Sequence, residues 1–250
     1  NRGQSSNDVI PTVLHVANRQ ELPSLVAAVR RLRDAFGERA TAFADVVKLG
    51  RTHLQDAVPM TLGQEFSGYA TQMAKAADRI ERTYASLEEL ALGGTAVGTG
   101  LNAHPAFAQR AIGQIATATD IPFRPADNRF EAIAARDAQV ELGGALNGLA
   151  VALMKIANDL RLLASGPRAG LGEIELPSLQ PGSSIMPGKV NPVIPEMVIQ
   201  VAAHVMGQVH TISVAGQHAP LELNMMHPLL IHETLSAIAL LRETTQAFAD

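Results

Sequence analysis

The stretch "LGGALNGLAVALMKIANDLRLL", residues 142–163, decides the fold class of this chain. Its large apolar residues recur in alternating steps of four and three. The average step of about 3.5 residues is typical of long helices that pack lengthwise against one another. The stretch therefore predicts a long helix with one apolar stripe facing a core. The stripe consists of Leu142, Leu146, Leu149, Leu153, Ile156, Leu160 and Leu163.

The same periodicity recurs elsewhere in the chain. Residues 22–47 and 221–248 also have a helical pattern, and no alternating strand pattern competes with it. The sequence therefore predicts an all-α fold, a long-helix bundle that occupies residues 1–250 as one domain. The two further stripes are Leu62, Phe66, Tyr69, Met73, Ala76, Ile80, Thr83, Leu87 and Leu90, and Val198, Val201, Val205, Val209 and Ile212.

Composition narrows the possible functions. Hydrophobic residues make up 47% of the 250 residues, which is enough for a sizeable core. The net charge of −4 gives no indication of a nucleic-acid or anionic-lipid partner. The chain has no cysteine, which excludes disulfides and thiolate metal sites. No uninterrupted apolar run reaches the roughly 18 residues typical of a membrane span, so we expect no membrane association.

Three polar loops separate the predicted helices: residues 50–59, 93–105 and 165–192. The last is long for a connection in a compact domain, and such loops are usually functional or disordered. Pro59, Pro105 and Pro192 stand where the next helices are expected to begin.

The end of the long connection, "GSSIMPGKVNP" at residues 182–192, is rich in chemically useful groups. Its glycines allow unusual backbone geometry, and its prolines prevent a helix from continuing. Ser183 and Ser184 supply hydroxyl groups, Lys189 a positive charge and Asn191 an amide. All precede a helix N-terminus, which favours anions. The stretch therefore indicates a site for an anionic substrate.

The other polar stretches allow two interpretations each. "SSND", residues 5–8, suits a helix cap, and it also suits a grip on a small polar ligand. His53, at an expected loop-to-helix junction in "THLQD", is either structural or a general acid or base. "GGTAVGTGLN", residues 93–102, has the wrong spacing for a dinucleotide loop and indicates a tight connection.

These motifs, in this order, resemble those of the fumarase/aspartase superfamily, and within it those of class II fumarases. The resemblance rests on "SSND", "GRTHLQDAVPMTLGQE", "GGTAVGTGLNAHP", "LMKIANDLRLLASGPRAGLGEI" and "GSSIMPGKVNP", and it covers essentially the whole chain.

The resemblance implies that residues 1–250 form the central helical bundle domain. The family's N-terminal and C-terminal domains are then absent from this chain. Four such bundles would form a homotetramer with a twenty-helix core, and each active site would be shared between subunits. We expect a cytoplasmic protein, a small dicarboxylate substrate, no metal and no cofactor. We also expect no nucleic-acid or membrane partner, and no activity from this segment alone.

The resemblance also implies the roles of individual residues in a reversible hydration of fumarate to L-malate. Ser183 would act as the base on carbon. His53, paired with Glu196, would handle the oxygen-side proton. The positions matching substrate-binding residues are Ser5, Ser6, Asn7, Thr52, Ser184, Lys189, Val190 and Asn191.

Two alternatives stay open. Aspartate ammonia-lyases share much of "DAVPMTLGQEF" and "KVNPVIPE", but they typically carry glutamine where this chain has His53 and threonine in place of Ser6. A catalytically silent structural relative is the other alternative. Ser183, His53 and Lys189, whose loss would indicate such a protein, are all present.

Overall fold

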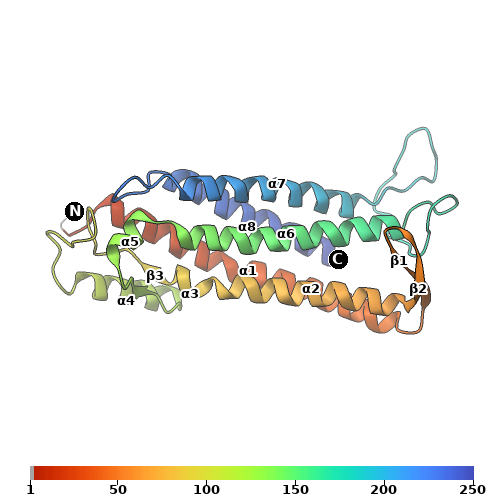
Figure 1. Cartoon of the computed structure of the whole chain (residues 1–250), viewed down its shortest axis with the longest axis horizontal. Coiled ribbons are helices and arrows are strands. Elements are labelled where there is room, and N and C mark those ends of the chain that lie inside the picture. The colour runs from red at the N-terminus through yellow and green to blue at the C-terminus, as the bar shows by residue number, and fades with distance from the viewer. Residues whose placement is uncertain (1–2) are drawn as a thin grey trace. The chain divides into compact units, whose positions relative to one another are not determined.

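A computed structural model describes residues 3–250 and is mostly helical, which confirms the all-α prediction (Figure 1). Five of the described helices are 21–37 residues long. In chain order, the elements are α1 (Ser6–Ala42), β1 (Val47–Thr52), β2 (Gln55–Thr61), α2 (Leu62–Arg82), α3 (Tyr84–Leu87), β3 (Glu89–Leu90), α4 (Phe107–Thr119), β4 (Arg124–Pro125), α5 (Arg129–Ala134), α6 (Asp137–Leu163), α7 (Val193–Gly216) and α8 (His227–Ala249).

Side-chain caps fix where several helices begin. Thr61 and Gln64 form a reciprocal capping box at the start of α2, in which each side chain accepts the other residue's backbone N–H. Asn128 caps α5 by accepting two N–H groups. The bounds differ from two predicted ranges, because α1 ends at Ala42 and α8 begins only at His227.

The stretch predicted as the 50–59 loop is instead part of a β-hairpin, so the prediction of a loop there was wrong. β1 and β2 pair antiparallel, with Thr52 opposite Gln55. His53 and Leu54 form the two-residue turn, so His53 lies at a hairpin tip and not at a junction with a helix. Pro59 lies within β2, and α2 begins only at Leu62. Elsewhere, β3 and β4 form a short parallel pair.

The chain divides into two compact units, and each of the five long helices contributes residues to both. The first unit contains residues 3–26, 78–147 and 205–240. Its core has two apolar clusters. One is built around Leu90, Ile112 and Phe123, and the other around Leu14 and Leu230.

The second unit contains residues 27–77, 148–204 and 241–250. Its core includes a cluster of aromatic rings in edge-to-face contact. The ring centroid of Phe36 on α1 lies 6.1 Å from that of Phe66 and 5.7 Å from that of Tyr69, both on α2. It lies 6.0 Å from the ring centroid of Phe248 on α8. Burial and the nearby carboxylates of Asp159 and Glu65 raise the pKa of Tyr69, so its hydroxyl stays protonated and donates to Asp159.

The predicted stripes are the buried faces of their helices. All seven residues of the α6 stripe are at most 5% exposed. The residues of the stripe from Leu62 to Leu90 are also buried, but the stripe is not one helix, because α2 ends at Arg82, Leu87 lies in α3 and Leu90 in β3. The α7 stripe holds except at Val201, which is half-buried, while the adjacent Ala202 faces the core.

Two of the described helices, α6 and α7, are long and apolar enough to cross a membrane by length and composition alone. Buried helices of globular proteins also meet this criterion. The prediction of no membrane span considered only uninterrupted apolar runs, and these helices interrupt theirs with single polar residues. Within the chain, 44% of the apolar window of α6 and 33% of that of α7 are buried.

Candidate active site

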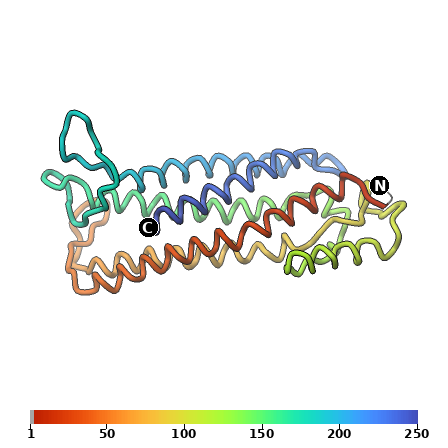
Figure 2. The backbone as a smooth tube through the Cα atoms, turned by 180° about the vertical axis from the view of Figure 1, so that it is seen from behind, coloured from red at the N-terminus to blue at the C-terminus, as the bar shows by residue number. Residues whose placement is uncertain are grey.

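The connection between α6 and α7 has neither helix nor strand, and its last part closes on itself as a loop (Figure 2). The Gly182 N–H donates to the Lys189 carbonyl at 2.9 Å, and the Asn191 side chain donates to the Gly182 carbonyl at 3.3 Å. A Cβ at Gly182 would lie 2.6 Å from the Lys189 carbonyl oxygen, so only glycine fits there. These contacts close a loop that contains Ser183 to Gly188.

Ser183 is held by its own loop. Its Oγ accepts the backbone N–H of Ile185 at 3.3 Å and that of Met186 at 3.2 Å. Two N–H donors on one hydroxyl oxygen would stabilise negative charge there. The apolar side chains beside it are not anchored, since Ile185 is 84% exposed and Met186 48%.

A cavity of about 1050 Å³ lies at the base of this loop, within the second unit. It is lined by three residues predicted to bind substrate, Lys189, Val190 and Asn191, and by the predicted histidine partner Glu196. Ser183 and Ser184, although described, are not among its lining residues. The structure thus gathers four of the predicted site residues around one space.

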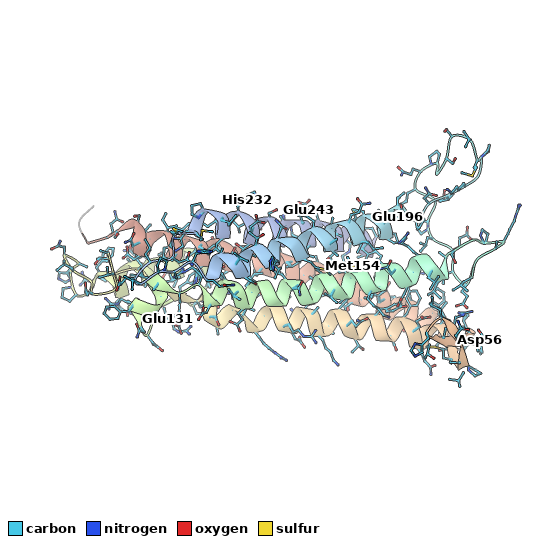
Figure 3. The ribbon with its side chains drawn as sticks, turned by 45° about the horizontal axis from the view of Figure 1, so that its top comes forward. Asp56, Glu131, Met154, Glu196, His232 and Glu243 are labelled. Atoms are coloured by element: carbon cyan, nitrogen blue, oxygen red, sulfur yellow. The ribbon has the colours of Figure 1, made fainter. Side chains whose placement is uncertain are left out.

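Glu196 lies in the first turn of α7, where the predicted helix N-terminus was expected to favour a carboxylate (Figure 3). Its Oε1 lies 3.9 Å from Nη2 of Arg161 on α6. Within the described residues of this single chain, no hydrogen bond joins Glu196 to His53. The predicted pairing of these two residues therefore stays a prediction.

His53 has an unusual backbone. His53 has φ of 55° and Leu54 has φ of 60°, so both central residues of the turn are left-handed. This is the turn geometry that two-residue hairpins favour, normally with Asn-Gly. Here both residues carry larger side chains, and Leu54 is 70% exposed, so neither is held by burial. The hairpin presents Thr52 and His53 outward at its tip.

The "SSND" segment belongs to the first unit, caps the start of α1 and contacts the 93–102 loop. The Asn7 N–H donates to Ser5 Oγ, and Ser6 begins α1. The buried carboxylate of Asp8 accepts the N–H groups of Ser5, Gly93 and Thr95 at 2.8–3.0 Å. Asp8 thereby ties Ser5–Asn7 to the 93–102 loop, and this loop is the tight connection that its glycines predicted.

Sequence reasoning missed two groups of polar residues. Asn158 and Arg161 line the cavity, and their spacing of three residues on α6 could have indicated a shared face.

The second group lies in the first unit and consists of His15, His227 and Arg136. Burial first, and then the charge of Arg136, lower the pKa of each histidine from 6.5 to about 4. Burial also lowers the pKa of Arg136 to about 10. No sequence signal distinguishes these residues from exposed ones.

Among the described residues, no group of three or more His, Cys, Asp or Glu side chains is arranged to hold a metal ion.

Known proteins match this chain along its whole length. A family model described as Lyase matches residues 1–207. The chain is 51% identical to the class II fumarate hydratase of Methylorubrum extorquens, and it covers 53% of that relative. It is 50% identical to the mitochondrial fumarate hydratase of Rattus norvegicus, again over about half of the relative. A crystal structure of class II fumarase from Schistosoma mansoni matches with a TM-score of 0.95 at 41% identity, over 100% of this chain and 56% of that one.

The chain thus spans about half the length of the relatives it matches. The structural match confirms the predicted fold class, since the long helices are those of a class II fumarase structure.

Proposed function

The chain belongs to the lyase family, with class II fumarate hydratases as its relatives, and on that premise we propose that it carries the central part of a fumarate hydratase. The reaction is the reversible addition of water to fumarate to give L-malate. The observation that carries the proposal is the Ser183 loop, whose hydroxyl accepts two N–H groups beside a cavity lined by Lys189 and Asn191.

The reaction needs three kinds of group. Malate loses a proton from a carbon next to a carboxylate, so a base is required. Hydroxide is a poor leaving group and must be protonated as it departs. The negative charge that builds up on the carboxylate in between needs cations and hydrogen-bond donors placed in advance. Base, acid and anion clamp are each worth several powers of ten in rate.

In this proposal, Ser183 takes the carbon-bound proton. A serine hydroxyl is a weak base unless its alkoxide is stabilised. The N–H groups of Ile185 and Met186 point at its oxygen and supply part of that stabilisation. The exposed position of the loop lets it close over a bound substrate, as mobile catalytic loops do.

The carboxylates of the substrate are bound by cations, amides and hydroxyls. Lys189, Val190 and Asn191 lie at the entry to α7, whose N-terminus favours an anion. We assign Ser184, Thr52, Ser5, Ser6 and Asn7 to the same task, on their match to the family's motifs.

His53 transfers the oxygen-side proton, through a water molecule, and Glu196 orients its ring. Glu196 accepts from one imidazole nitrogen, which leaves the other free for proton exchange. In one chain Glu196 faces Arg161 and His53 stands at an exposed hairpin tip. We therefore propose that the two meet between different copies of the chain.

A homotetramer with shared active sites follows from the same argument. Fewer than half of the residues in the apolar windows of α6 and α7 are buried by their own chain, and Val151, Leu162 and Val214 on these helices are exposed. Exposed apolar side chains on long helices support an interface, and other copies of the chain are the occupants we propose. A cytoplasmic location is supported by the bacterial relatives, and the mitochondrial relatives of rat and mouse provide the alternative.

The test is an absorbance assay for fumarate with full-length protein. We expect fumarate to form from L-malate and not from L-aspartate. Release of fumarate from aspartate would instead establish an ammonia-lyase, and inertness toward both would establish a silent relative. Residues 1–250 alone should turn over neither substrate, and robust malate turnover by that segment would contradict the shared-site proposal.

A further inference from the structure

A four-residue ionic cluster lies beside the candidate site, within the second unit. Glu173, in the first half of the α6–α7 connection, receives a hydrogen bond of 2.5 Å from Arg51 Nη1 through its Oε1. Its Oε2 lies 3.1 Å from Lys48 Nζ. Lys48 also donates to Glu65 in the first turn of α2. We call Lys48, Arg51, Glu65 and Glu173 the strand clamp.

The strand clamp is shielded from water, which strengthens it relative to surface ion pairs. The Lys48 side chain is 8% exposed, Glu173 19%, and Arg51 and Glu65 23% each. Burial alone would raise the pKa of Glu173, but hydrogen bonds from Arg51 and Lys48 outweigh it and the pKa is lowered. Glu173 is therefore an ionised carboxylate that both cations share.

The backbone around Glu173 is fixed as well. Its N–H donates to the carbonyl of Leu163, the last residue of α6, at 2.8 Å. The Gly172 N–H likewise returns to the Ser165 carbonyl. The connection therefore folds back onto the end of α6 before it continues toward Ser183. Glu173 is the residue through which this anchored segment forms ion pairs with another element.

The element it grips is β1, which leads directly into the His53 turn. Lys48 and Arg51 are three residues apart, and in a regular strand they would lie on opposite faces. The pairing with β2 shifts register between Leu49 and Arg51, and both side chains reach one carboxylate. Arg51 is two residues from His53, so the strand clamp holds the base of a turn whose own residues are exposed.

We propose that Glu173 is a positioning residue, which fixes the His53 hairpin relative to the connection that carries Ser183, Lys189 and Asn191. The proposal rests on the proposed function for its kinetic consequence, but not for its structural one. Glu173 also contributes to the cavity wall, yet its charge is committed to two cations and would repel a dicarboxylate. It therefore acts through β1 and is not itself a group that binds substrate.

The strand clamp also accounts for how a strained turn persists at the hairpin tip. Left-handed geometry is sterically unfavourable at two non-glycine residues and survives only where the surroundings fix it. Neither His53 nor Leu54 is buried, so the fixing contacts lie further down the strands. Among the described ion pairs, those of Lys48 and Arg51 are the ones that attach β1 to other elements.

The experiment compares full-length parent with Glu173→Gln, which keeps the side-chain shape and removes its charge. We expect kcat for malate to fall roughly 10-fold to 100-fold, as for a misplaced catalytic group, with KM changed less. Glu173→Asp should recover part of the loss. Arg51→Gln should cause a loss no larger than that of Glu173→Gln, because it leaves the Lys48 contact in place. The double variant should lose little more than Glu173→Gln alone, because the Arg51–Glu173 contact is already lost there. Glu38→Gln, an exposed glutamate on α1 of the same unit, is the matched control and should behave as parent.

Amide hydrogen exchange separates this proposal from the proposed function. Amide exchange at residues 49–55 should be faster in Glu173→Gln than in the parent, and unchanged in the Glu38→Gln control. This holds whether or not the parent turns over malate. Parent kcat together with parent exchange in Glu173→Gln would overturn the proposal. So would a lower melting temperature with parent kcat, since that describes a stabilising residue alone. A parent without malate turnover would defeat the proposed function, and the exchange result would still decide the role of Glu173.

Discussion

Two polar regions of this chain contrast in how their groups are satisfied. In the first unit, Asn18 donates to Gln139 at 2.7 Å, and both side chains are fully buried. His15 Nδ1 donates to the Glu89 carbonyl at 2.9 Å, and Arg136 is 2% exposed. In the second unit, Ser183 to Asn191 lie in a largely exposed loop held by a few backbone contacts.

The difference separates polar residues that build the fold from those that act. The buried cluster is enclosed by its own chain, and the cost of burying it falls on stability. The loop contributes little to burial, so its residues are free to be selected for chemistry. Substitutions in the loop should therefore change turnover without changing stability, while the buried cluster should control how stability responds to pH.

The largest expected effect is that of Ser183→Ala in the full-length protein. Removing the base on carbon should lower kcat for malate by roughly 10²-fold to 10⁴-fold, the range for general acid–base groups. The melting temperature should stay within error, because the hydroxyl bonds only to its own loop. Ser67→Ala on α2, in the same unit, is the control. A variant that retains parent turnover would remove Ser183 from the mechanism.

Glu196→Gln should have the next largest effect. Loss of the carboxylate that orients His53 should lower kcat by roughly 10-fold to 10³-fold, with a changed pH profile of kcat. Thermal unfolding should be little altered, because the only ion pair described for Glu196 among residues 3–250 is a long one to Arg161. An unchanged pH profile would contradict the pairing with His53.

Acid should test the buried cluster. The pKa of His15 and of His227 is lowered from 6.5 to about 4, mainly by burial, so the unfolded chain binds more protons between these values. The contribution of the two histidines to stability should therefore be complete above about pH 6.5 and fall as pH drops toward about 4, by up to about 3 kcal/mol for His15 and by less for the less enclosed His227. Urea unfolding at several pH values measures this slope, and His227→Gln should make it shallower. A slope that the substitution leaves unchanged would exclude His227 as its source.

The smallest expected effect concerns the hairpin tip. Leu54→Gly should raise the free energy of unfolding by about 1 kcal/mol, because glycine adopts the left-handed geometry without steric cost and Leu54 packs against little. Thermal unfolding of Leu54→Gly beside an exposed-leucine control, Leu221→Gly with φ of 61°, would measure it. If Leu221→Gly were stabilised and Leu54→Gly were not, the left-handed geometry at Leu54 would carry no steric cost that glycine removes, which would contradict the prediction.

The helices could be predicted from sequence because burial imposes a regular spacing, as the α6 stripe from Leu142 to Leu163 shows. The β1–β2 hairpin could not, because His53-Leu54 is not one of the dipeptides that mark such a turn, and because the strands do not bury an alternating apolar face, since Val47 and Val58 are exposed. The loop residues Lys189 and Asn191 were predicted from their chemistry, and the structure places both at one cavity.

Residues far apart in sequence were harder to predict. Glu173 meets Lys48 and Arg51 across more than a hundred residues, and no local pattern specifies that contact. Arg136 looks like an ordinary exposed charge near a helix start, and only the surrounding fold buries it.

The central claim is that the active site is shared between copies of the chain, with His53 of one copy paired to Glu196 of another. The most direct measurement is the distance between the His53 ring nitrogens and the Glu196 carboxylates in a structure of the assembled full-length protein. We predict one such pair within about 3.2 Å, joining two different chains, with Arg161 no longer the nearest partner of that carboxylate. An assembly in which every Glu196 lies beyond hydrogen-bonding reach of every His53 would contradict the claim.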